Sequence, residues 1–268
     1  MTPLITLQSS GLEVLVAPDL GGKTLSVRSK SGHELLFQRS GAQPVGRSEF
    51  GDWAFGWDDC WPSVEAGGPG YPDHGALWSL SARVREKSAS SLTLETAPRD
   101  RSWLYAKTWT LVDKTIAIRV SMENLSTLPL PSFWTLHALV RLEDDMRLVF
   151  PAGDSRKTVS GNDFFPKSFP ARGSASKFWI PEPVERGFCG VDYPSLGMAY
   201  RLEWDPRELP YLGYWVTNGG FRGERNAAWE PSDGFYDSIQ TARRNGALPV
   251  LEPGGTRTLN LKMTWREL

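Results

Sequence analysis

Two long stretches of this sequence alternate between apolar and polar residues, and this alternation limits the chain to folds built from β-strands. The stretch 116–123 places Ile, Ile, Val and Met at every second position, and 258–265 does the same with Leu, Leu, Met and Trp. Because successive side chains of a strand point to opposite faces, each stretch predicts a strand with one buried face. Asp113-Lys114 separates two such stretches and predicts a hairpin turn.

The rest of the chain is divided into short segments by 26 glycines and 20 prolines. Helical patterns are scarce, and the best covers 235–244, with Ser232 and Asp233 as possible caps and Gly246 as its stop. The polar, Pro/Gly-rich segment 154–176 is predicted to be a long loop. Shorter strands are predicted at 12–17, 24–28, 34–38, 77–85, 92–96, 133–142 and 212–217.

No repeat and no linker-like change of composition divides the 268 residues, so we expect one antiparallel all-β domain spanning 1–268. A formal net charge of -1 offers no basic surface for nucleic acid or for an anionic membrane. We find no apolar run long enough to cross a bilayer and no signal-peptide pattern. With only two cysteines, a disulfide framework is not expected, and we predict a cytoplasmic protein.

Twelve tryptophans are the most unusual feature of the composition. Any single tryptophan is more often part of a core, but its flat apolar face also stacks well on a sugar ring. Trp53, Trp57 and Trp61 flank the acidic pair Asp58-Asp59, a combination that suits a sugar ring and its hydroxyls. The alternative is that these acids lie on the surface, as most acids do.

The few histidines can be weighed one by one. His33 lies in a turn and is expected to be solvated, whereas His74 lies in a Pro/Gly loop before a strand, where catalytic groups are common. His137 lies within an apolar stretch, where a core or edge role is the ordinary one. Glu230 precedes Pro231 and a turn, so it is either well placed at a cleft or a plain surface acid.

Other catalytic motifs are missing from the sequence. There is no glycine-rich phosphate loop and no Gly-x-Ser-x-Gly nucleophile motif. The histidines and cysteines lack the spacing of a zinc site. We therefore expect neither a cofactor nor a metal.

Taken in order along the chain, these segments resemble the aldose 1-epimerase family, whose fold is the galactose mutarotase-like β-supersandwich with one or two short helices. The segments that carry the resemblance are Leu20-Gly21-Gly22-Lys23-Thr24-Leu25, Gly32-His33-Glu34-Leu35-Leu36, Asp59-Cys60-Trp61-Pro62, Asp73-His74-Gly75, Trp134-Thr135-Leu136-His137 and Trp229-Glu230-Pro231, followed by Asp237 and Ala242. The resemblance implies that Glu230 is the catalytic base, that His137 is the acid and that His74 steadies the same sugar oxygen.

The resemblance also suggests residues that bind the sugar. Arg47 is the candidate for the family's sugar-binding arginine, and Asp205 lies where some members place a hydroxyl-binding acid. Two departures stand out: Ala138-Leu139 replaces the proline and aromatic residue that usually follow the second histidine, and Asp58-Asp59 replaces an arginine of the sugar-phosphate branch. An acidic pair would repel phosphate and favour a neutral sugar. The remaining predicted sugar contacts are Trp57 and Trp229.

The sequence therefore predicts an isomerase that interconverts the anomers of a neutral monosaccharide, as a monomer or homodimer. The alternative is a non-catalytic carbohydrate-binding protein that uses the same cleft. A lyase or glycoside hydrolase on the same sandwich is a third possibility. The identity of the sugar and its configuration at C4 stay open.

Overall fold

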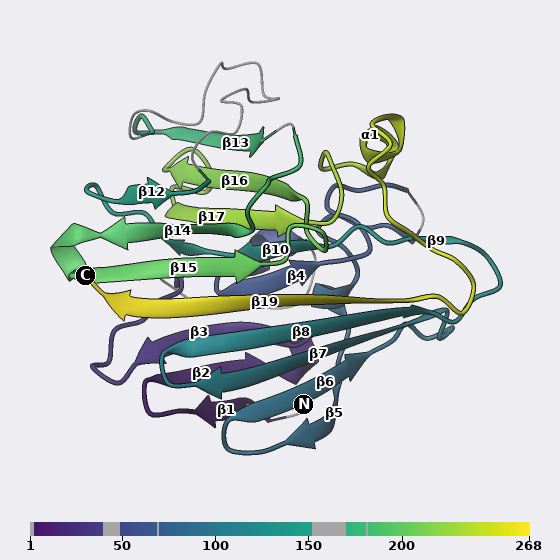
Figure 1. Ribbon diagram of the computed structural model, residues 1–268, viewed down its shortest axis with the longest axis horizontal. Coiled ribbons are helices and arrows are strands. Elements are labelled where there is room, and N and C mark those ends of the chain that lie inside the picture. Colours follow the sequence, from purple (N-terminus) through teal and green to yellow (C-terminus); the bar gives the residue numbers. More distant parts are fainter. Residues whose placement is uncertain (1–2, 40–48, 69, 152–169, 181) are drawn as a thin grey trace.

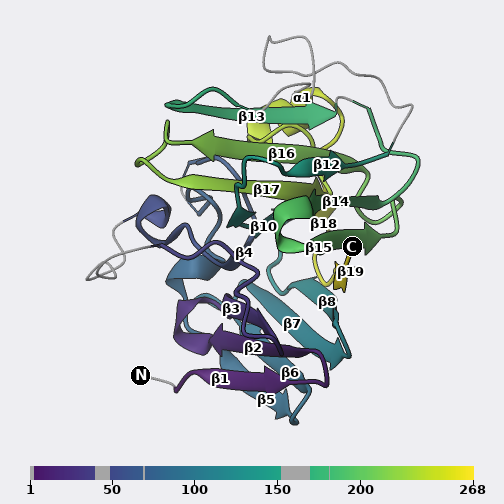
Figure 2. The same ribbon diagram turned by 90° about the vertical axis from the view of Figure 1, so that its left-hand side faces the viewer.

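The structure, a computed structural model, describes residues 3–39, 49–68, 70–151, 170–180 and 182–268. Two large antiparallel sheets face each other, and Figure 2 shows them side by side, with β13 and β12 at the top and β1 and β5 at the bottom. A two-stranded ribbon and one short α-helix lie at the end of this sandwich (Figure 1). The predicted antiparallel all-β fold is confirmed.

Among the described residues the first sheet has nine strands and the second has eight. The first sheet runs β1 (Ile5–Gln8), β2 (Leu12–Ala17), β3 (Lys23–Ser29), β4 (Trp57–Cys60), β10 (Thr135–Ala138), β17 (Arg225–Ser232), β16 (Tyr211–Asn218) and β13 (Ser174–Ile180), with β11 (Val140–Arg141) also paired to β17. The second sheet runs β12 (Arg147–Val149), β14 (Phe188–Tyr193), β15 (Met198–Trp204), β19 (Thr256–Glu267), β8 (Thr115–Asn124), β7 (Trp103–Val112), β6 (Ser91–Thr96) and β5 (Arg83–Lys87). The smaller elements are β9 (Leu130–Pro131), β18 (Val250–Leu251), α1 (Ile239–Arg244) and the 3₁₀ turns η1 (Pro18–Leu20), η2 (Phe50–Trp53), η3 (Leu77–Ser79) and η4 (Pro194–Leu196).

The two strictly alternating stretches form the centre of the second sheet, as predicted. β7 and β8 make the expected hairpin, with Asp113 at its turn in the left-handed region (φ 49°), and β19 pairs with the other edge of β8. Their apolar side chains alternate with wetter ones and point into the core between the sheets. This core is one continuous hydrophobic cluster that reaches from Ile5 to Trp265.

Two of the predicted strands are wrong in part. The segment 34–38 forms only an isolated bridge, because the Glu34 carboxylate accepts hydrogen bonds from the backbone N–H groups of Val27 and Leu36, both at 3.1 Å. The segment 77–85 starts as the 3₁₀ turn η3, whose Leu80 N–H donates to the Leu77 carbonyl at 2.9 Å, and becomes a strand only at Arg83. In both segments local turn bonds replace the bonds of a β-ladder.

The helix and the predicted long loop also differ from expectation. α1 begins at Ile239, because the Ser238 hydroxyl caps it by accepting a hydrogen bond from the Thr241 N–H at 3.2 Å. Ser232, a predicted cap, instead lies in β17. Of the segment 154–176, residues 154–169 lie outside the described residues, and the last three belong to β13.

Two further features concern the predictions on cysteines and membranes. Cys60 and Cys189 are free thiols, and both are buried. No helix within the described ranges is long and apolar enough to cross a membrane.

Candidate active site

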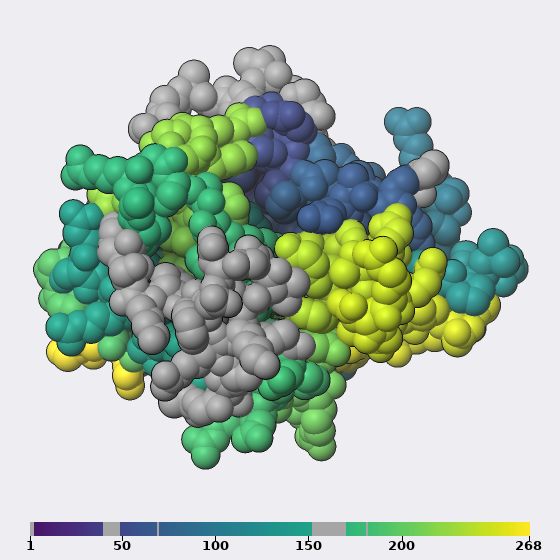
Figure 3. Space-filling view, turned by 90° about the horizontal axis from the view of Figure 1, so that it is seen from above, coloured from purple at the N-terminus to yellow at the C-terminus, as the bar shows by residue number. Residues whose placement is uncertain are grey.

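A cavity of about 360 Å³ lies on the face of the first sheet that points away from the core. Its floor is formed by β10, β13, β16 and β17, and its walls come from the loops around 49–54, 64–74 and 221–224. Figure 3 shows this face from above, where the segments around 60–75 and 235–245 lie side by side. They are joined by the Glu65 N–H, which donates to the Asp237 carbonyl at 3.1 Å.

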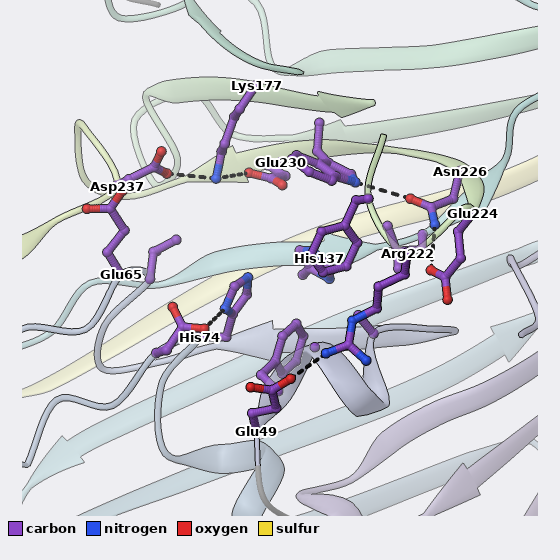
Figure 4. Close-up of a pocket in the computed structure, with 18 residues that line it drawn as sticks. Glu49, Glu65, His74, His137, Lys177, Arg222, Glu224, Asn226, Glu230 and Asp237 are labelled. Carbon is purple, nitrogen blue, oxygen red and sulfur yellow. Dashed lines mark hydrogen bonds and ion pairs between the residues drawn. The ribbon is translucent and has the colours of Figure 1, made fainter. Parts of the chain in front are cut away.

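Strand alternation brings Glu230 and His137 to the same cavity (Figure 4). Because Trp229 points into the core, its neighbour Glu230 must point out of it. The same rule applies on β10, where Leu136 is a core residue and His137 faces the cavity. β10 pairs directly with β17, so the two side chains share one face of one sheet.

His74 reaches the cavity through a turn that only a glycine allows. His74 and Gly75 both have positive φ, 55° and 74°. A Cβ atom at Gly75 would lie only 2.3 Å from the Trp61 carbonyl oxygen, so the chain needs glycine there to pass this close to β4. The turn thereby fixes the position of the histidine that precedes it.

The two histidine rings form one aromatic group with Phe50. The His74 ring stacks on Phe50 with 4.0 Å between centroids and 10° between planes. The His137 ring packs edge-on against both, 5.4 Å from His74 and 5.3 Å from Phe50. His74 Nδ1 lies 2.8 Å from the Asp73 carboxylate, and this hydrogen bond lowers the pKa of Asp73. Both imidazoles are therefore held rigidly at the cavity wall.

Lys177 is a central member of the site that the sequence did not reveal. Its ammonium lies 2.7 Å from Glu230 Oε2 and 2.7 Å from Asp237 Oδ1, so it joins two cavity carboxylates (Figure 4). Lys177 comes from β13, the edge strand of the sheet. The sequence carried no signal for it, because Lys177 directly follows the segment 154–176 that was predicted to be a loop, and only strand pairing shows what Lys177 faces.

The surroundings shift the proton affinities of the two central groups in opposite directions. Burial raises the pKa of Glu230, and Asp237 adds to this, while Lys177 opposes it. Burial, helped by the charges of His74 and Lys177, holds the pKa of His137 well below its usual range. At neutral pH His137 is thus mainly neutral, and its buried Nδ1 has no hydrogen-bond partner among the described residues.

Arg222 lines the opposite end of the cavity, and Arg39 lies nearby without lining it. Arg222 pairs with Glu49 and, at 2.7 Å, with Asp52, while Arg39 pairs with Glu224 at 2.6 Å. These ion pairs hold η2 and the loop after β16 together. They also leave Arg222 already neutralised where it lines the cavity.

The cavity lining is acidic overall. Six of its described residues are acids, and two, Lys177 and Arg222, are permanent cations, each paired with two carboxylates. No group of three or more His, Cys, Asp or Glu side chains that could hold a metal ion is found in the described part of the chain.

The predicted sugar-binding acids of β4 do not reach the cavity. Asp58 forms a buried ion pair with Lys23. Asp59 points into the core, where Lys107 lies 2.8 Å away and the Tyr105 hydroxyl donates to it. Both acids are therefore neutralised by lysines. They cannot repel a phosphate group in the cavity, so they no longer support the prediction of a neutral sugar.

The other predicted sugar contacts also lie elsewhere. Trp57 is fully buried in the core, and Trp229 donates from Nε1 to the Gly190 carbonyl at 2.7 Å on the core side of β17. Asp205 is paired with Arg207 at 2.6 Å and does not line the cavity. Arg47 lies outside the described residues. The structure thus brings together Glu230, His137 and His74, but none of the predicted sugar contacts that it describes.

The fold is shared with several solved structures. A proposed aldose 1-epimerase from Escherichia coli K12 has a TM-score of 0.78 and 18% identity, over 99% of both chains. A galactose mutarotase-like protein from Lactobacillus casei has a TM-score of 0.75 and 16% identity, over 98% of this chain and 100% of that one. Another galactose mutarotase-like protein, from Clostridium acetobutylicum, has a TM-score of 0.72 and 17% identity, over 99% and 95%. The sequence matches no protein-family model and no curated protein. The chain therefore has the galactose mutarotase-like fold, as its sequence suggested.

Proposed function

We propose that this protein is an aldose 1-epimerase-type isomerase that interconverts the anomers of a neutral monosaccharide. The observation that carries the proposal is the convergence of Glu230, His137 and His74 on one cavity. Its volume of about 360 Å³ is that of a small-molecule site.

The reaction needs one base and one acid on opposite sides of the anomeric carbon. Glu230 removes the proton from the hydroxyl at C1, the bond between C1 and the ring oxygen breaks, and His137 gives a proton to that oxygen. Rotation about C1–C2 in the open aldehyde and closure on the other face then produce the second anomer. The two protons return by the reverse path, so nothing is consumed.

The shifted pKa values suit these roles. A raised pKa makes the Glu230 carboxylate a better base, provided that it stays ionised at neutral pH. A lowered pKa makes protonated His137 scarce but a strong acid, and the neutral ring takes the proton back easily. His74, stacked beside His137, is placed to hold the same oxygen.

The acidic lining supports a neutral substrate. Carboxylates outnumber cations among the described lining residues, and both cations are already paired. A phosphate or carboxylate on the sugar would be repelled at this short range. The acidic cavity lining thus supports a neutral substrate in place of Asp58-Asp59, the pair on which the prediction from the sequence rested.

The test is a measurement of anomer exchange over a panel of neutral and phosphorylated sugars, by polarimetry and by NMR. We expect acceleration for at least one neutral sugar and a loss of about 10²–10⁴-fold in Glu230→Gln, the usual contribution of a positioned base. Glu203→Gln, the same change at an exposed site on β15, is the matched control. Absence of acceleration for every sugar, or full activity in Glu230→Gln, would disprove the proposal.

One observation favours a second function, sugar binding without turnover. The Glu230 carboxylate is already engaged by Lys177 at 2.7 Å, and an ion pair lowers the basicity of a carboxylate. This alternative predicts that sugars change the fluorescence of Trp215, which lines the cavity, while anomer exchange stays at the rate of buffer. The same panel therefore separates the two functions.

A further inference from the structure

Lys177 connects three elements that carry the chemistry of the cavity. It projects from β13, meets Glu230 of β17 with the strand β16 between them, and meets Asp237 in the turn before α1. Its side chain is 23% exposed, whereas the Glu230 side chain is 2% exposed. Lys177 thus lies at the cavity wall and holds a carboxylate that is almost fully buried.

A glycine makes this contact across β16 geometrically possible. Gly213 is the register partner of both Glu230 on β17 and Trp179 on β13. A Cβ atom at position 213 would lie 3.3 Å from Glu230 Oε2 and 3.2 Å from the Trp179 ring. Without a side chain at this position, the Glu230 carboxylate can extend over β16 toward Lys177 and away from its own strand.

We propose that Lys177 is a positioning residue for the reaction: anchored by Asp237, it fixes the Glu230 carboxylate over Gly213 and keeps it ionised as the base. This inference rests on the proposed function, because the base role of Glu230 does. It goes beyond that function by naming the two residues that set the proton affinity of the base.

The charges around Glu230 lead to a specific expectation. The ionisable groups that face it are Lys177 from β13, Asp237 and Glu65 from the loops, His74 and His137 beside it, and Cys60 from β4. Of these, Lys177 is the permanent cation, and Asp237 is the second carboxylate that Lys177 holds. Removing the lysine must therefore raise the pKa of Glu230, and removing the charge of Asp237 must lower it.

A direct chemical role for Lys177 is disfavoured by the same contacts. Burial alone would lower its pKa, but Asp237 and Glu230 together raise the pKa of Lys177 above its ordinary value. An ammonium held in this way is neither a nucleophile for the sugar aldehyde nor a general base. Its effect on the reaction must therefore pass through Glu230.

The main experiment compares Lys177→Met with Asp237→Asn. We expect the limb of the pH dependence of kcat/KM that Glu230 sets to move up by about one unit or more in Lys177→Met, the usual effect of losing an opposite charge at short range. In Asp237→Asn it should move down. In both variants KM should change little, and Lys177→Arg should restore much of the shift. Movement of this limb in the same direction in Lys177→Met and Asp237→Asn, or no movement in either variant, would overturn the proposal.

A second readout does not depend on activity. Carboxyl ¹³C NMR gives the titration midpoint of Glu230 directly, with Glu230→Gln identifying its resonance. Opposite midpoint shifts in the two variants support the role of Lys177 even if the wild type proves inactive, in which case only the proposed function fails. If the protein is active but the midpoints do not move, only the role of Lys177 fails. Should Lys177→Met not fold, Asp237→Asn still decides, because a midpoint that does not fall contradicts the proposal.

Discussion

Two of the lysine–carboxylate clusters formed by the described residues differ in place: one lies in the core and the other at the cavity. In the core cluster, Lys107 lies 2.8 Å from Asp59, with side-chain exposures of 5% and 3%. In the cavity cluster, Lys177 lies 2.7 Å from both Glu230 and Asp237. The two clusters are alike in chemistry and distance but differ in access, because only the second lines a cavity.

The difference shows that a buried ion pair alone does not indicate a site. Asp59 also accepts hydrogen bonds from the Tyr105 hydroxyl and from Trp57 Nε1, and Lys107 packs over the Trp57 ring at 4.6 Å. Both carboxylate oxygens of Asp59 are thus hydrogen-bonded to core residues, so no ligand can reach them. Glu230, in contrast, has Lys177 as its protein partner and lines the cavity.

The largest effect that this comparison predicts is on stability. Lys107→Met leaves the Asp59 charge buried without a counter-ion, and loss of one partner of a buried pair costs about 3–5 kcal/mol. Urea unfolding at pH 7 measures this loss. The matched control is Lys107→Met with Asp59→Asn, which removes both charges and keeps an acceptor for Tyr105. Recovery of most of the stability is expected in the double variant, and equal losses in both would mean that packing, not charge, is responsible.

Asp233 is another buried carboxylate, and its cationic partner is more distant than the lysine of either cluster. Its side chain is fully buried, and its carboxylate accepts a hydrogen bond from the Trp134 N–H at 2.7 Å and lies 3.5 Å from the nearest nitrogen of Arg257. Burial raises the pKa of Asp233 to about 7. Between the unfolded pKa of 3.8 and this value the folded state binds the extra proton, so this contribution to stability is present at acidic pH and lost as pH rises through about 7.

Asp233→Asn tests this dependence directly. The variant keeps the acceptor for Trp134 but does not titrate, so its unfolding free energy should lack the component that falls between pH 4 and 8. The wild type should lose about 4 kcal/mol more than the variant over this range, since each pKa unit between 3.8 and about 7 corresponds to about 1.4 kcal/mol. Parallel stability curves for the two proteins would show that Asp233 is ionised in the folded state throughout.

The strands of this fold could be predicted because their signal is local. Alternation marks β7, β8 and β19 without knowledge of any partner strand. The segment 34–38 failed because the side chain of Glu34 takes the amide bonds that a strand would make, which composition does not show.

Site residues could be predicted only where their order along the chain resembled that of a known family. His74, His137 and Glu230 were found through their order along the chain, and alternation then explains why the last two face the cavity. Asp58 and Asp59 were misplaced because their partners Lys23 and Lys107 lie 35 and 48 residues away in sequence. Lys177 was missed for the same reason, since its contact depends on the register of β13, β16 and β17.

A smaller effect on stability is expected at the cavity. Lys177→Met should cost less stability at pH 7 than Lys107→Met, because Glu230 and Asp237 line the cavity and are not enclosed in the core as Asp59 is. The freed carboxylates of Glu230 and Asp237 can be solvated from the cavity. Thermal unfolding of the two lysine variants side by side measures the difference. A loss as large as that of Lys107→Met would place Lys177 among the structural residues and remove the contrast between the clusters.

The smallest effect is expected at Asp205, which is the one predicted sugar contact at the surface among those that the structure describes. Its hydrogen bonds to Arg207, which lower the pKa of Asp205, are local and screened by water. Because Asp205 does not line the cavity, Asp205→Asn should leave the melting temperature, KM and kcat unchanged within error. Calorimetry and the anomer-exchange assay check this, with Glu203→Gln as the matched surface change on the same sheet. A several-fold rise of KM in Asp205→Asn alone would mean that the sugar contacts a surface well outside the cavity. In that case, lining this cavity would not be what separates the charges that contact the sugar from those that do not.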